Sequence, residues 1–184
     1  MRLKYAIAVA GIVLAFQPGL ASGQATAVNI WLLKDTGNNQ WCAYPNEATW
    51  NTAVQGIGAM TVGELHYSGK RLQQIDVTDS DETGDWIVYD NYFLDDRGQI
   101  VKLSRTANVQ PGDRSVVQTY VIADGKAKKT ETTQTQLSTG KLLKSPKSVW
   151  LPKIPISIET KSFPFFGLLN RPGLMTSNKT CIAG

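Results

Sequence analysis

Reverse-turn sequences at regular intervals constrain this chain more than any other feature. The candidate turns are Asp35–Asn39, Ser68–Lys70, Ser80–Gly84, Asp95–Gly98, Gln110–Asp113, Asp124–Gly125 and Ser138–Gly140. From Ser68 onward their centres recur every 13 to 15 residues, an interval that fits one strand and one tight turn. Apolar and polar residues alternate between the turns, which is the period of a strand. The sequence therefore predicts an all-β fold, a twisted antiparallel meander curved into a half-barrel or open barrel, without long crossover connections.

Two regions depart from the strand pattern. Asn46–Gln55 reads as a short helix, with Asn46 as its N-cap and Gly56 at its end. Near the C-terminus, Val149–Ile158 contains two prolines and Phe163–Leu169 is the apolar run FPFFGLL. Because proline limits ladder hydrogen bonding, we expect this C-terminal segment to be irregular and to pack across the sheet.

Three turns set the expected strand register. Gly98 suits the left-handed residue of a bulged hairpin, Pro111 and Gly112 suit a type II turn, and Asp124-Gly125 suits a two-residue hairpin. The expected cross-strand pairs are Leu103 with Tyr120, Val101 with Ile122, and Ala127 with Ile122. On this register four residues share one face and form a candidate apolar ligand face: Tyr89, Phe93, Leu103 and Tyr120.

The first 25 residues have the pattern of a cleavable signal peptide. Arg2 and Lys4 precede the apolar run Tyr5–Phe16, and small-x-Ala sequences predict cleavage after Ala21 or Ala25. The alternative is an uncleaved anchor helix, but the run is shorter than the ~20 residues that span a bilayer. We expect a secreted or periplasmic protein whose residues 26–184 form a single β-rich domain, with no transmembrane segment in the mature chain.

The net charge bears on the expected partners, and the two cysteines bear on the expected covalent structure. Removal of residues 1–25 takes away two of 19 basic residues and none of 15 acidic residues, which lowers the formal charge from +4 to +2. With no nucleic-acid motif present, we expect no nucleic-acid partner.

Cys42 and Cys181 are an even pair, and in an oxidising compartment we expect them to form a disulfide. A metal or redox pair is the alternative, but a C-x-x-C motif is absent.

One acidic stretch resembles a calcium-binding loop. Oxygen ligands occupy positions 1, 3 and 5, Gly84 occupies position 6, and an acid occupies position 12. The candidate calcium ligands are Asp79, Asp81, Thr83 and Asp90. Position 12 is Asp rather than the bidentate Glu, and strands rather than helices are expected on either side. A solvated acidic turn is the interpretation we favour, so we expect no cofactor.

No catalytic constellation emerges from the remaining residues. His66 is the only histidine and no G-x-S-x-G motif is present, so a nucleophile–histidine pair has little support. We interpret His66 as a surface or packed residue. The expected register places Asp90 opposite Ser104 and diagonal to Lys102, as an ordinary cross-strand pair. Hydrolysis by a carboxylate pair stays open because two acids can come from anywhere in a sequence.

These patterns favour an exported, non-catalytic β-sheet protein that binds an apolar or lipid-like small molecule. The aromatic sheet face and the apolar C-terminal segment are the basis of this hypothesis. The alternative is an envelope or extracellular protein-interaction module that offers a strand edge or a charged patch to an envelope protein. A hydrolase that uses a carboxylate pair is a weaker alternative.

Overall fold

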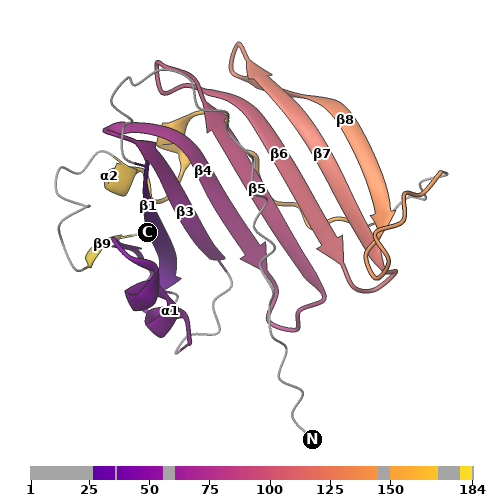
Figure 1. Cartoon of the computed structure of the whole chain (residues 1–184), viewed down its shortest axis with the longest axis horizontal. Helices are drawn as coiled ribbons and strands as arrows, with labels where there is room; N and C mark the ends of the chain where they lie inside the picture. Colours follow the sequence, from indigo (N-terminus) through magenta and orange to yellow (C-terminus); the bar gives the residue numbers. More distant parts are fainter. Residues whose placement is uncertain (1–26, 36, 56–60, 145–149, 170–178, 184) are drawn as a thin grey trace, which may run out of the picture.

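Nine antiparallel strands form one curved, twisted sheet in the computed structural model of the chain (Figure 1). The structure describes residues 27–35, 37–55, 61–144, 150–169 and 179–183, so the predicted signal peptide and Gly56 lie outside the described residues. The strands are β1 (Ala27–Asp35), β2 (Gln40–Tyr44), β3 (Thr61–Ser68), β4 (Arg71–Ser80), β5 (Trp86–Leu94), β6 (Ile100–Val109), β7 (Arg114–Ala123), β8 (Lys126–Gln136) and β9 (Thr180–Ala183). The helices are α1 (Glu47–Gln55), the 3₁₀ turn η1 (Thr160–Ser162) and α2 (Phe166–Leu169). The predicted all-β architecture is confirmed.

The strand order is β8-β7-β6-β5-β4-β3-β1-β2-β9, which leaves β8 and β9 as the two edges of the described sheet. Strands β3 to β8 form the predicted meander, in which each strand pairs with the next one. The expectation of no long crossover is wrong at one place. Because β1 lies between β2 and β3, the chain from β2 must pass over β1 to reach β3, and α1 belongs to that connection.

The predicted helix and its cap are confirmed. The Asn46 side-chain oxygen accepts a hydrogen bond from the Thr49 backbone N–H at 2.9 Å, which satisfies one of the free donors at the start of α1. Trp50 Nε1 donates to the Leu32 carbonyl oxygen at 3.0 Å. Trp50 also packs beside Leu33 and Cys42, so α1 covers one face of the sheet, here called the outer face.

The predicted register is confirmed between β6, β7 and β8. Leu103 pairs with Tyr120, and Ile122 pairs with Ala127. Gly98 and Gly125 adopt the left-handed φ values of 74° and 67° that their turns require. Local turn chemistry therefore aligned these strands beside their turns, and an irregularity between Thr119 and Tyr120 shifts the register between β7 and β8 farther along.

The predicted register between β5 and β6 is wrong by one residue. Phe93 pairs with Lys102 but Leu94 pairs with Ile100, so Val101 is an extra residue that forms a bulge. Val101 is consequently 39% exposed instead of lying in the core opposite Ile122. The expected turn at Gly98 is present, since the Gly98 N–H donates to the Asp95 carbonyl oxygen at 3.0 Å and the Asp95 N–H donates to the Gln99 carbonyl oxygen at 2.9 Å. The bulge at Val101 is an additional one, within the strand.

A one-residue shift moves every side chain of a strand to the other face of the sheet. Leu103 therefore pairs with Tyr92, whereas Tyr89 pairs with Thr106. Of the four residues in the candidate apolar ligand face, Leu103 and Tyr120 lie on the inner face, opposite α1. The other two, Tyr89 and Phe93, lie on the outer face, so the expected shared face is wrong.

The C-terminal segment packs on the inner face, as predicted. Phe163, Phe165 and Leu168 are buried in the main hydrophobic cluster with side chains of the sheet. The rings of Trp41 and Phe165 meet edge to face with centroids 4.8 Å apart. The sheet thus lies between α1 on one side and the C-terminal segment on the other.

A buried ion pair holds part of that segment against the sheet. Asp90 is 3% exposed and Arg105 is 8% exposed, and the two residues pair directly across β5 and β6. Arg105 Nε and Nη2 donate to the two Asp90 carboxylate oxygens at 2.7 and 2.6 Å. Arg105 Nη1 donates to the Ile154 carbonyl oxygen at 2.9 Å. The expected pairing of Asp90 with Ser104 and Lys102 is wrong, because the bulge shifts the register.

The predicted disulfide is present between Cys42 and Cys181. These residues are direct cross-strand partners on β2 and β9, at a sequence separation of 139 residues. The bond therefore attaches the short edge strand β9 to the sheet. Within the described residues, no helix has the length and hydropathy needed to cross a membrane.

We predict that Arg105→Met lowers the free energy of unfolding by about 3–5 kcal/mol, because it leaves the Asp90 carboxylate buried without a partner. The double variant Asp90→Leu/Arg105→Met should recover most of that loss, since neither charge then stays in the core. Urea denaturation followed by circular dichroism measures both values. Equal stability of the wild-type protein and Arg105→Met would contradict the assignment.

We also predict that Cys42→Ala/Cys181→Ala lowers the free energy of unfolding by about 2–5 kcal/mol, because the long loop is no longer closed in the unfolded chain. The matched control is the wild-type protein in reducing buffer, which should unfold at the same denaturant concentration as the double variant. A double variant as stable as the oxidised wild type would show that the bond contributes nothing to folding.

Candidate functional site

The inner face carries a pocket of about 430 Å³ between the ends of several strands and the C-terminal segment. Lys34 of β1, Thr61 of β3 and Asp79 of β4 contribute polar groups from the sheet. Lys153 and Ile154 line the opposite wall. Five aromatic side chains complete the lining: Trp41, Trp86, Tyr92, Phe163 and Phe165. The pocket is mostly apolar, with a few charged groups.

Asp79 is a carboxylate of this pocket that is in no ion pair among the described residues. Burial raises the pKa of Asp79, the Thr61 hydroxyl opposes the rise by donating to Oδ1 at 2.7 Å, and the negative charge of Asp90 adds to it. Asp90 also lines the pocket, but Arg105 occupies both of its oxygens. Asp79 is therefore the acid of this pocket whose carboxylate is available to interact with a ligand.

The structure does not assemble the candidate calcium site. Asp79 accepts a hydrogen bond from Thr61, whereas Asp81 accepts bonds from the Thr83 hydroxyl at 2.7 Å and the Trp86 backbone N–H at 3.2 Å. Asp90 is held by Arg105 within the core. Among the described residues these side chains do not converge as a group of metal ligands. Asp81 and Thr83 instead stabilise the turn between β4 and β5.

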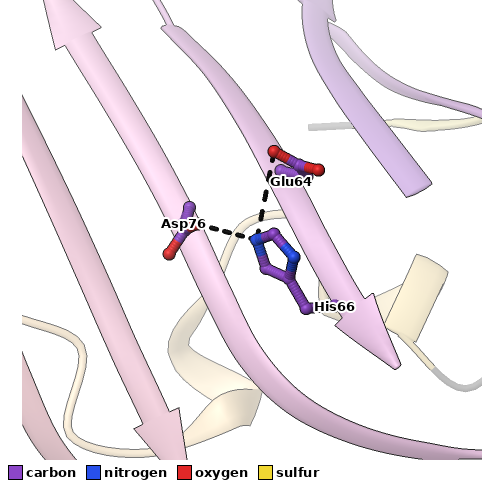
Figure 2. Close-up of side chains that lie close together, drawn as sticks. All are labelled: Glu64, His66 and Asp76. Carbon is purple, nitrogen blue, oxygen red and sulfur yellow. Dashed lines mark hydrogen bonds and ion pairs between the residues drawn. The ribbon is translucent and has the colours of Figure 1, made fainter. Parts of the chain in front are cut away.

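A second cluster lies on the outer face, where Glu64, His66 and Asp76 meet (Figure 2). Glu64 and His66 are two residues apart on β3, so their side chains point to the same face. Asp76 is the direct cross-strand partner of Glu64 on β4. His66 Nε2 lies 2.7 Å from Asp76 Oδ2 and 3.9 Å from Glu64 Oε2.

Two amide side chains orient the carboxylates of this cluster. Asn29 Nδ2 donates to Glu64 Oε1 at 2.7 Å. Gln74 Nε2 donates to Asp76 Oδ1 at 2.7 Å and to Oδ2 at 3.0 Å. Asn29 comes from the neighbouring strand β1 and Gln74 from β4, the strand of Asp76, and both are cross-strand partners of His66.

The cluster shifts the pKa values of two of its members. Burial opposes protonation of His66, but the hydrogen bond and the negative charge of Asp76, together with the charge of Glu64, raise the pKa of His66 overall. Burial raises the pKa of Glu64, the charge of His66 opposes the rise, and the charge of Asp76 adds to it. The cluster therefore favours a positive charge at its centre.

Sequence reasoning missed this cluster, because it treated His66 as a lone histidine. The information was present in the sequence: Glu64-x-His66, the Gly69 turn, and then Gln74-x-Asp76. Folding that hairpin places Asp76 beside Glu64 only in one register, and a bulge between His66 and Tyr67 sets that register. If β3 and β4 are paired residue by residue from their turn without this bulge, the three side chains do not come together.

Comparisons with protein-family models, curated proteins and solved structures found no match for this chain. The fold and the two sites therefore define its class, an open antiparallel sheet protein with a polar cluster on one face and an apolar pocket on the other.

We predict that Asp79→Asn raises the free energy of unfolding at neutral pH, by less than about 1 kcal/mol, and that the gain disappears near pH 3. Because the folded-state pKa of Asp79 is raised, the native protein binds its proton more tightly than the unfolded chain does. Stability therefore falls as pH rises from the unfolded pKa through the folded pKa, and Asn removes this loss while it still accepts the Thr61 hydrogen bond. Urea titrations of both proteins across this pH range test the prediction, and a pH-independent difference would contradict it.

Proposed function

We propose that the protein binds a small lipid-like ligand, with an apolar chain and an anionic end, in the inner pocket. The observation that carries this proposal is the aromatic pocket of about 430 Å³ beside two lysines. Its volume falls within the roughly 300–1,000 Å³ of typical small-molecule sites, which are mostly apolar with a few polar groups that fix orientation.

The wall of the pocket formed by residues 153–157 is held in place rather than loosely apposed. Arg105 bonds the Ile154 carbonyl oxygen, and the Ser157 backbone N–H donates to the Tyr92 hydroxyl at 3.3 Å. The same Tyr92 hydroxyl donates to Asp90 at 3.3 Å, so both anchors belong to one buried network. A preformed wall lowers the ordering cost that a ligand must overcome.

The charges at the pocket support an anionic end group. Lys34 is half-buried and Lys153 is exposed, which places their charges at the boundary between pocket and solvent. Asp79 lies close enough to Lys34 for the lysine to lower its pKa slightly, against the stronger effect of burial. Lys153 has no ion-pair partner among the described residues. It is therefore the cation best able to meet a ligand carboxylate.

The pocket supports binding rather than hydrolysis. Sugar hydrolysis by acids needs two carboxylates with separate roles. Of the two acids at this pocket, Asp90 is committed to Arg105, which leaves Asp79 alone.

Export belongs to the same proposal. A disulfide such as Cys42–Cys181 persists in an oxidising compartment, which fits a secreted or periplasmic protein. Residues 1–25 supply the predicted signal peptide for that route.

The test compares dodecanoate, dodecanol and dodecylamine, three ligands with the same chain and different end groups. We expect saturable binding, with the affinity highest for dodecanoate, intermediate for dodecanol and lowest for dodecylamine. Isothermal titration below the micellar concentrations measures these affinities. Lys153→Gln should weaken dodecanoate binding roughly tenfold and leave dodecanol unchanged, since only the charged end loses a partner.

Lys128→Gln is the matched control, because it removes the same charge from the exposed strand β8, away from the pocket. Its affinity for dodecanoate should equal that of the wild type. Failure of all three ligands to bind would overturn the proposal, and tighter binding of dodecylamine than of dodecanoate would overturn the assignment of an anionic end.

A further inference from the structure

We infer that Glu64, His66 and Asp76 bind one divalent transition-metal ion on the outer face, with Zn²⁺ as the best fit. This site is separate from the proposed lipid pocket, because it lies on the opposite side of the sheet. Its three ligand atoms are His66 Nε2, one Glu64 oxygen and one Asp76 oxygen, and all three lie within 4.8 Å of one another.

The geometry suits an ion bound between these atoms. Zinc binds histidine nitrogen and carboxylate oxygen at about 2.0–2.2 Å, so neighbouring ligand atoms of a tetrahedral site stand roughly 3.3 Å apart. In the cluster, the distance from His66 Nε2 is 2.7 Å to the Asp76 oxygen and 3.9 Å to the Glu64 oxygen. These separations bracket the tetrahedral value, and Figure 2 shows both contacts meeting at the same His66 nitrogen.

The negative charge of the two carboxylates in this cluster favours the binding of a cation. Neither carboxylate forms an ion pair with a lysine or an arginine in the part of the chain that the structure describes. A third acid, Glu47 of α1, adds to the negative potential at Glu64. Two partly buried carboxylates beside one imidazole are therefore under-compensated, and a divalent ion restores the balance.

The supporting hydrogen bonds resemble those around metal ligands, which are commonly oriented by second partners. Asn29 takes one oxygen of Glu64, Oε1, and leaves the other oxygen, Oε2, on the side of His66. Gln74 fixes the Asp76 carboxylate against rotation. One nitrogen and two oxygens form a mixed donor set that suits zinc better than the all-oxygen sites of Ca²⁺ and Mg²⁺.

A neighbouring cleft offers space for a further ligand. It measures about 400 Å³, lies between α1 and the outer face, and is lined by Glu64 and Asp76 with Trp31, Trp50 and Tyr89. Three protein ligands and one position left for water or a small molecule is the pattern of zinc sites that exchange ligands. The cleft would therefore admit a small oxygen or nitrogen donor with an aromatic or apolar part.

The test uses tag-free, disulfide-intact protein that has been treated with EDTA and returned to metal-free buffer at neutral pH. Isothermal titration should show one Zn²⁺ per chain, and Co²⁺ should give the visible absorption of a four-coordinate site. His66→Gln should weaken Zn²⁺ binding at least about 100-fold. Asn29→Ala should weaken it about tenfold, because it removes only the hydrogen bond that orients Glu64.

Glu131→Gln is the matched control, since it removes one negative charge from the exposed strand β8 and should leave Zn²⁺ affinity unchanged. Circular dichroism shows whether each variant is folded, and Asn29→Ala tests the site if His66→Gln does not fold. Absence of Zn²⁺ binding would overturn the inference, as would unchanged affinity in folded His66→Gln, or Ca²⁺ and Mg²⁺ binding as tight as Zn²⁺. Dodecanoate binding is measured on the same variants, so failure of the metal site and failure of the lipid pocket are distinguishable.

Discussion

The buried pair of Asp90 and Arg105 is the interaction on which the rest of the inner face depends. A bidentate contact between two nearly inaccessible charges forms only if β5 and β6 keep one register. Arg105 Nη1 donates to the Ile154 carbonyl oxygen, so the arginine that pairs β6 with β5 also attaches the C-terminal segment to the sheet. A buried charge without its partner is costly, and this cost makes the register and the attachment parts of one cooperative unit.

Two bulges determine which side chains meet on each face. The bulge at Val101 brings Asp90 to Arg105 on the inner face, and the bulge after His66 lets Asp76 face Glu64 on the outer face. In both cases one additional residue changes the partner of a charged group. The candidate pocket and the candidate metal site thus arise from local departures from a regular ladder, which is where bulges commonly redirect side chains.

The sheet separates two kinds of chemistry because its two faces are covered differently. Phe163 and Phe165 fill much of the inner face and leave an apolar pocket near Asp79. On the outer face, α1 covers β1 and β2 but stops short of the Glu64 cluster, so polar groups remain accessible beside the cleft. The crossover that sequence reasoning did not anticipate is the element that creates this second cleft.

The sequence by itself determined the strands of the meander, the turns at Gly98 and Gly125, the capped helix and the Cys42–Cys181 partnership, because each depends on local conformational preference or on the count of one residue type. Tertiary structure alone decided that Tyr89 faces away from Leu103, that Arg105 is the partner of Asp90, and that β1 lies between β2 and β3. The physical reason is that strand side chains alternate with a period of two. A single bulged residue reverses that alternation at little local cost, so only the packing of the whole sheet selects the register.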